Sequence, residues 1–303
     1  MEGHLKYGQS WSSQGQPAGT APGGFPISPG VHIDGIKQQI YSIMRARGMT
    51  DTYVSILWIL IPVLVTIIGA VTIILIGIYE SINAIIGFPL IDMPLDWTLS
   101  HFALTIISAI IIGIIVSTLF AILTFKLVER QNKHFERESH LRRNIIAMLR
   151  SVAGSPEKES TIATELATMN ILHGEATGDE VLHSAILWAL AVFFCWAFIP
   201  ISWVLILYMF YFLMKTIYNH DRRWYEFSNQ TMSALSKLGY SVAPPYNVRV
   251  LQRRSFAIYL ILSIITFGLF ALYWWYALIQ DPNEHFKNQW YLEDHLSNII
   301  AQK

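Results

Sequence analysis

The chain has 303 residues, of which 53% are hydrophobic and only 14% are charged, with 21 Lys and Arg balanced by 21 Asp and Glu. Soluble globular proteins contain roughly 25% charged residues, so this composition excludes an ordinary water-exposed surface. The zero net charge gives no reason to expect nucleic acid as a partner, and the sequence has no Walker loop, dinucleotide fingerprint or His-Glu-x-x-His helix. We therefore expect an integral membrane protein without a cofactor.

The N-terminal leader divides into two parts. Residues 1–34 are rich in Gly, Pro, Ser and Gln and contain too few apolar groups to offset the entropy of ordering, which predicts a flexible arm. Residues 35–48 place Ile36, Ile40 and Met44 on one helical face, with basic residues nearby. This pattern predicts a basic interfacial helix that lies on the membrane surface.

Four stretches contain no Asp, Glu, Lys or Arg, and each exceeds the roughly 20 residues needed to cross a bilayer. They predict an all-α integral membrane protein with about four membrane segments. Residues 53–127 should form a transmembrane hairpin, followed by cytosolic helices in 128–182. Each of the last three segments should lead into an amphipathic cytosolic helix. The four uncharged stretches are 54–79, 97–125, 184–214 and 255–280.

Lys and Arg are frequent in the leader and in residues 126–182, whereas the connection between the first two stretches has none. The positive-inside rule then predicts a multi-pass protein of the cell membrane with a cytoplasmic N-terminus. Residues 183–235 should hold a membrane segment and its exit helix, 236–253 a linker, and 254–303 another membrane segment and exit helix.

The third stretch conflicts with a simple alternation of sides. If it crosses, the basic segment that follows it lies outside, against the positive-inside rule. Pro200 stands near the middle of the stretch, so a re-entrant hairpin is the alternative, and the fourth stretch leaves the same two possibilities open. We favour a crossing, which predicts that residues 215–253 and 126–182 lie on opposite sides of the membrane.

The chain repeats itself where it leaves the membrane. Aligning two of the exits superimposes Asn132, His134 and Phe135 on Asn283, His285 and Phe286, and a more degenerate copy places His220 at the same position. Such self-similarity predicts a repeated supersecondary unit, here a membrane segment followed by an amphipathic helix.

Residues 253–296 contain Leu-Ser-Ile-Ile-Thr-Phe-Gly, then Tyr-Trp, then Asn-Glu-His-Phe. This run resembles an uncharacterised family of small membrane domains of unknown function, and residues 184–235 resemble it more weakly. The resemblance implies an architecture and no chemistry. Within it we expect a turn motif at Thr266 and Gly268, with Pro200 as the counterpart in the weaker copy.

The repeated histidines allow two interpretations. Three imidazoles could converge on a metal or sense pH. Alternatively, each could tie its membrane segment to its exit helix by a hydrogen bond. We favour the second interpretation, because a repeated joint repeats its residues, and we predict neither a metal nor a catalytic residue. The predicted joint comprises Asn132, His134, Phe135, His220, Asn283, His285 and Phe286.

A second His-rich segment, residues 173–183, includes Gly174 and Gly178 and predicts a solvated loop between helices. The uncharged membrane stretches contain none of the ionisable residues that usually mark a transport path. We therefore expect a non-enzymatic scaffold or accessory subunit, with the lipid bilayer and either further copies or other membrane subunits as partners. A channel or small transporter is the first alternative, and a membrane-bound metalloprotein using the repeated histidines is the second.

Overall fold

The computed structural model describes residues 33–87, 95–194, 199–243 and 248–302, and within these residues the chain forms ten helices and no strand. Residues 1–32, most of the predicted arm, lie outside the described part. The first described helix is α1 (Ile33–Arg45), followed by the short α2 (Arg47–Thr50).

The apolar stripe of helix α1 packs against a different surface from the one that we expected. Ile36, Ile40 and Met44 are buried in one apolar cluster with residues of the bundle, such as Leu141 and Leu296. The predicted stripe is therefore present, but it packs against protein instead of a membrane surface. The physical reason is that the exit helices have apolar stripes of their own, and α1 covers part of them.

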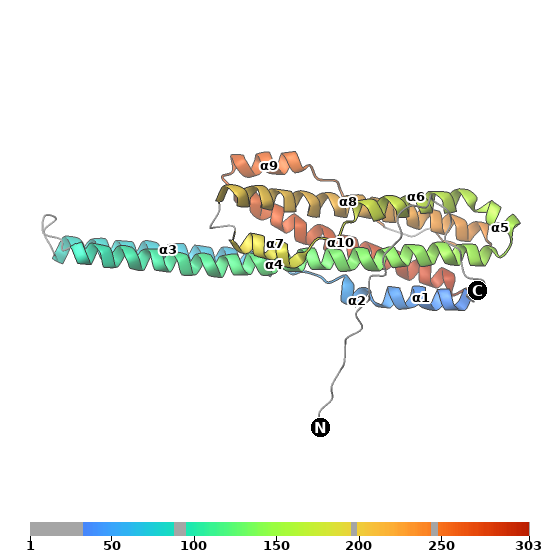
Figure 1. Ribbon diagram of the computed structural model, residues 1–303, viewed down its shortest axis with the longest axis horizontal. Coiled ribbons are helices and arrows are strands. Elements are labelled where there is room, and N and C mark those ends of the chain that lie inside the picture. Colours follow the sequence, from blue (N-terminus) through green and yellow to red (C-terminus); the bar gives the residue numbers. More distant parts are fainter. Residues whose placement is uncertain (1–32, 88–94, 195–198, 244–247, 303) are drawn as a thin grey trace, which may run out of the picture. The chain divides into compact units, whose positions relative to one another are not determined.

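Helices α3 (Leu57–Gly87) and α4 (Leu95–Ala153) lie side by side and form the longest hairpin (Figure 1). Both contain a segment long and apolar enough to cross a membrane. Only 17% of the most apolar part of α3 and 11% of that of α4 is buried. Both helices are thus long and apolar enough to span a membrane, and they are less buried than the core helix of a soluble protein would be. Gly69 permits the close packing, because a Cβ there would lie 2.8 Å from the Ile112 side chain.

The third apolar stretch forms two helices, which is compatible with both a kinked crossing and a re-entrant hairpin. It forms α7 (Ala185–Phe193) and the start of α8 (Ile199–Lys237), with Pro200 in the first turn of α8, where a missing N–H is tolerated. The fourth stretch breaks in the same way into α9 (Phe256–Ile265) and α10 (Leu269–Ile300).

The break between α9 and α10 lies at the predicted turn motif. Gly268 has φ 89°, in the left-handed region that favours glycine. The Thr266 hydroxyl accepts a hydrogen bond from the backbone N–H of Phe270 at 2.9 Å and donates to the carbonyl of Leu262 at 2.7 Å. The turn is thus stabilised by the two residues that the sequence singled out.

The described residues therefore contain three hairpin units, α3–α4, α7–α8 and α9–α10. The second helix of each unit continues beyond its apolar part, and these three continuations lie beside one another as a bundle (Figure 1). Helices α5 (Pro156–Thr161) and α6 (Ala163–Asp179) connect the first unit to the second, and α6 packs against α8.

Candidate metal centre

The three repeated histidines meet at one point between the hairpin units. His134 of α4, His220 of α8 and His285 of α10 are each 0% exposed. The Nε2 atom of His134 lies 3.0 Å from Nε2 of His220 and 3.1 Å from Nε2 of His285. The sequence argument expected one histidine at each of three separate joints, whereas the structure brings all three into one cluster.

The other ring nitrogen of every histidine faces a carboxylate. Because an ionised carboxylate only accepts hydrogen bonds, each Nδ1 atom must hold the proton of its ring. Each ring then directs the lone pair of Nε2 towards the shared centre. The three pairs are His134 with Asp51 at 2.9 Å, His220 with Glu180 at 2.8 Å, and His285 with Asp221 at 2.6 Å.

Arginines support two of these carboxylates. Asp51 accepts from Arg137 at 2.8 Å and from the indole N–H of Trp290 at 2.7 Å. Burial by itself would raise the pKa of Asp51, but its contacts with His134 and Arg137 outweigh burial and bring the pKa below its ordinary value.

Glu180 has the same kind of support. It accepts from Arg142 at 2.7 Å and from Arg223 at 3.1 Å. Burial would raise the pKa of Glu180, but its contacts with His220 and Arg142 lower it below its ordinary value. Both carboxylates therefore remain ionised and able to orient the rings behind which they lie.

Two of the histidines have pKa values below the ordinary value. Burial lowers the pKa of His134 to about 4, although Asp51 opposes this shift, and burial lowers the pKa of His220 well below its ordinary value. Rings that use Nδ1–H to donate to a carboxylate leave no donor among the three Nε2 atoms. A cation between them resolves this conflict. Tetrahedral zinc with Zn–N bonds of about 2.0–2.1 Å separates its nitrogen ligands by roughly 3.3 Å. The two distances from Nε2 of His134 are close to this value, and the three ligand atoms all lie within 4.8 Å of one another.

The other predicted joint residues hold the segments that contain these carboxylates. The Asn132 amide donates to the carbonyl of His183 at 2.6 Å and accepts from its N–H at 3.1 Å. Asn283 makes the same pair of bonds with the backbone of Val54, at 3.0 and 3.3 Å. Each asparagine thus fastens the segment that leads into a different hairpin unit, α7–α8 for Asn132 and α3–α4 for Asn283.

The two predicted phenylalanines lie against the imidazoles. The Phe286 ring is centred 4.6 Å from that of His134, and the Phe135 ring 4.8 Å from that of His220. These contacts exclude water from the sides of the cluster.

His173 and His183, from the second His-rich segment, belong to no metal-ligating group that the described residues form. That segment is mostly helical, because α6 extends to Asp179.

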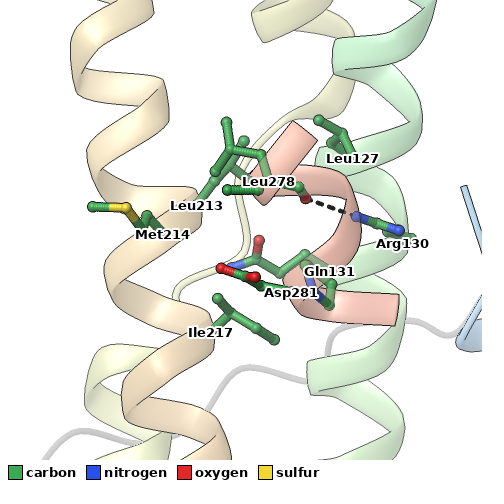
Figure 2. A pocket seen from close by; sticks show the side chains of 10 residues that line it. Leu127, Arg130, Gln131, Leu213, Met214, Ile217, Leu278 and Asp281 are labelled. Atoms are coloured by element: carbon green, nitrogen blue, oxygen red, sulfur yellow. Dashed lines mark hydrogen bonds between the residues drawn. The ribbon is translucent and has the colours of Figure 1, made fainter. Parts of the chain in front are cut away.

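A small cavity of about 10 Å³ lies between the same three helices, one turn from the histidines (Figure 2). Such a volume is close to the minimum that holds one water molecule. Arg130 lines it and donates to the carbonyl of Leu278 at 2.9 Å. Asp281 and Gln131 supply further polar groups.

One turn from the histidines in the opposite direction, Glu138 is fully buried and accepts a hydrogen bond from Gln289. Its Oε1 atom has no hydrogen-bond partner. Burial raises the pKa of Glu138 to about 8, so this carboxyl is mostly protonated at neutral pH. A protonated, uncharged carboxyl group, that of Glu138, therefore lies one helical turn from the histidine cluster.

The three carboxylates were not predicted as partners of the histidines. Asp51 and Glu180 lie in the segments before α3 and α7 and not on the exit helices that contain the histidines. The available signal was their common position shortly before an apolar helix. Asp221 gave no such signal, because it follows His220 directly on α8.

The fold and the cluster thus define an all-helical protein with two helices suited to crossing a membrane and a buried group of three histidines. Residues 254–300 match a family described as a domain of unknown function, DUF4234. The expected resemblance to an uncharacterised family is confirmed at this level. Comparison with curated proteins and with solved structures gave no match.

Proposed function

We propose that this chain is a membrane-anchored, non-enzymatic metal-binding protein in which His134, His220 and His285 hold one divalent transition metal. The observation that supports this proposal most directly is the convergence of three Nε2 atoms whose partner Nδ1 atoms are all committed to carboxylates. This proposal takes up the second alternative from the sequence.

Zinc is the metal that fits this set best. Imidazole suits zinc, copper, nickel and iron, and zinc centres commonly use three histidines whose second nitrogen donates to a carboxylate. Each ligand comes from a different hairpin unit, so the metal would link three units in addition to the packing, hydrogen bonds and ion pairs between them. The role that follows is metal-dependent closure of the helical bundle, since all three histidines are fully buried.

We further propose that only α3 and the apolar part of α4 cross the bilayer. Helices α7 and α9 have 9 and 10 residues, which reach about 14–15 Å at 1.5 Å per residue, against a bilayer core of about 30 Å. Contact between His134 and His220 supports placing residues 126–182 and 215–253 on the same side. The α7–α8 and α9–α10 units would then be re-entrant hairpins, which accounts for the basic residues after the third stretch.

Cysteine labelling tests this topology. In a Cys195→Ser background, cysteine replaces either Ser160 or Ser236 in sealed vesicles, and a membrane-impermeant thiol reagent is added to one side. We expect both positions to react from the same side. Labelling from opposite sides would contradict the re-entrant arrangement and restore the crossing that the sequence favoured.

Metal content tests the proposed centre. The full chain is purified in mild detergent, stripped with a chelator, incubated with Zn²⁺ and analysed by elemental mass spectrometry and thermal unfolding. We expect one metal per chain and a higher unfolding midpoint, because a ligand that binds only the folded state stabilises it. His220→Asn should abolish both effects, and the matched control His140→Asn, at an exposed position on α4, should retain them.

A stripped protein that takes up no metal would contradict the proposal, as would equal uptake by His220→Asn and His140→Asn. The structural-joint interpretation makes a different prediction for His285. It expects His285→Asn to preserve stability and His285→Leu to lose about 1 kcal/mol, whereas the metal proposal expects both to lose the bound ion. The scaffold and channel functions, and an oligomeric or multi-subunit assembly, stay predictions that the metal proposal does not require.

A further inference from the structure

We propose that the cleft between α8 and the start of α9 binds the headgroup of an anionic phospholipid. The cleft has a volume of about 690 Å³, and its lining combines cationic, hydroxyl and aromatic side chains. It lies between the second and third hairpin units and is separate from the histidine cluster. The residues used below are Tyr211, Lys215, Arg253, Arg254, Ser255 and Phe256, all of which line it.

The charge of the cleft favours an anion. Arg254 is neutralised by Asp281, to which it donates from Nε at 2.8 Å and from Nη2 at 2.9 Å. Lys215 and Arg253 are exposed, and neither forms an ion pair with another described residue. The Lys215 ammonium lies 5.3 Å from the centre of the Tyr211 ring, which fixes it beside the cleft. Two uncompensated positive charges therefore face the same space.

The cleft lies at the level expected for lipid headgroups. Lys215 is the first charged residue after the third apolar stretch, and Arg254 is the last one before the fourth. Both helices therefore leave the apolar region at this point. Basic residues at such a boundary attract anionic lipids by about 1 kcal/mol each.

Apolar surface continues from the cleft along both helices. Ile258 and Ile261 on α9 and Tyr208 on α8 are large side chains that remain exposed in the described chain. The Tyr211 and Phe256 rings pack edge to face at 5.4 Å beside the cations. A ligand with an anionic head and apolar tails matches this surface, whereas free phosphate would use only the head position.

The start of α9 adds hydrogen-bond donors. Ser255 caps this ten-residue helix by accepting from the N–H of Ile258, and Phe256 and Ala257 line the cleft in the first turn. Unpaired N–H groups at a helix N-terminus favour negative charge. They point to a phosphate group as the part of the headgroup that is bound.

Native mass spectrometry of the full chain released from detergent tests the proposal. The protein is titrated with phosphatidylglycerol and, separately, with phosphatidylcholine of the same acyl chains. We expect retention of phosphatidylglycerol in preference to phosphatidylcholine. Lys215→Gln combined with Arg253→Gln should weaken phosphatidylglycerol binding by about 30-fold, and binding of phosphatidylcholine should not change.

The matched control is Arg222→Gln combined with Lys287→Gln, which removes the same charge from two exposed positions outside the cleft. It should bind both lipids like the parent. Equal loss in the two double variants, or no preference for phosphatidylglycerol in the parent, would overturn the proposal. Displacement of the lipid by an equal concentration of inorganic phosphate would also overturn it, because the cleft would then recognise free phosphate.

Discussion

The apolar N-terminal half of α4 and its C-terminal half in the bundle differ in which side chains they expose and which they bury. In the apolar half, large side chains such as Ile107 and Ile111 are exposed, and few residues are buried. In the bundle half, His134, Arg137 and Glu138 are almost completely buried. One uninterrupted helix thus exposes apolar side chains in the half where lipid is the expected solvent. It buries polar side chains in the half where water is the expected solvent.

This contrast indicates what the polar interior contributes. Burying ionised groups is expensive, and apolar replacements of a complete ion network are often as stable or more so. The Arg137 and Asp51 pair is therefore better explained by the geometry that it imposes on His134 than by a gain in stability. Three changes test this contrast and a fourth tests the turn between α9 and α10, from the largest expected effect to the smallest.

Arg137→Met should cause the largest loss. Arg137 donates to Asp51 and to Glu293 at 2.8 Å each, and its removal leaves two buried carboxylates without their cation. We expect the free energy of unfolding to fall by about 4 kcal/mol. Lys133→Met, which breaks a half-exposed pair with Glu129, should cost less than about 1 kcal/mol. Equal effects of the two changes on chemical unfolding in detergent would contradict a buried network.

Ile111→Lys tests whether the outward side chains of the apolar half face lipid. A lysine at a membrane-facing position in the centre of a span costs about 3 kcal/mol. Ile171→Lys on α6 is the control, since Ile171 is also exposed but lies in the bundle region, where water can solvate the charge. Thermal unfolding in lipid nanodiscs should separate the two variants. If both are tolerated equally, the apolar half of α4 does not contact lipid.

Glu138→Gln tests the neutral acid beside the cluster. The folded-state pKa of about 8 exceeds the ordinary value of 4.5, so the stabilising contribution of Glu138 is complete below pH 4.5 and is lost as pH rises through 8. Relative to the parent, the variant should gain about 2 kcal/mol between pH 5 and pH 7, measured with a chelator present. Glu136→Gln, at an exposed position, should show no such trend. A constant difference for Glu138→Gln would disprove burial as the cause.

Gly268→Ala should have the smallest effect. With φ 89°, residue 268 lies where a Cβ is strained, so alanine should lower stability by about 1 kcal/mol. Gly174→Ala is the control, because this glycine is helical and its Cβ would meet nothing within 4 Å, so alanine should be neutral or stabilising. Thermal unfolding of both variants checks the α9–α10 turn. A stabilising Gly268→Ala would show that the turn adopts another conformation.

Several parts of the site could be predicted from local pattern. The alignment of the exits placed His134, His220 and His285 at one repeated position, and Thr266 and Gly268 were expected at a turn. These features repeat within short segments, so the sequence displays them directly. The break in the third stretch was weighed but not favoured, because an uncharged run has the same composition whether it forms one long helix or two short ones.

By itself, the sequence predicted a helical chain with four uncharged stretches, each long enough to cross a membrane, and one histidine position shared by three exits. In the structure, two helices are long and apolar enough to cross. Only the tertiary structure decided that these histidines converge, that their carboxylate partners lie largely in linkers, and that the stripe of α1 covers the bundle. The physical reason is that periodicity reports which face of one helix is apolar. Convergence depends on how segments up to 151 residues apart are placed against each other, and hydrogen bonds such as that between Asn283 and Val54 fix that placement.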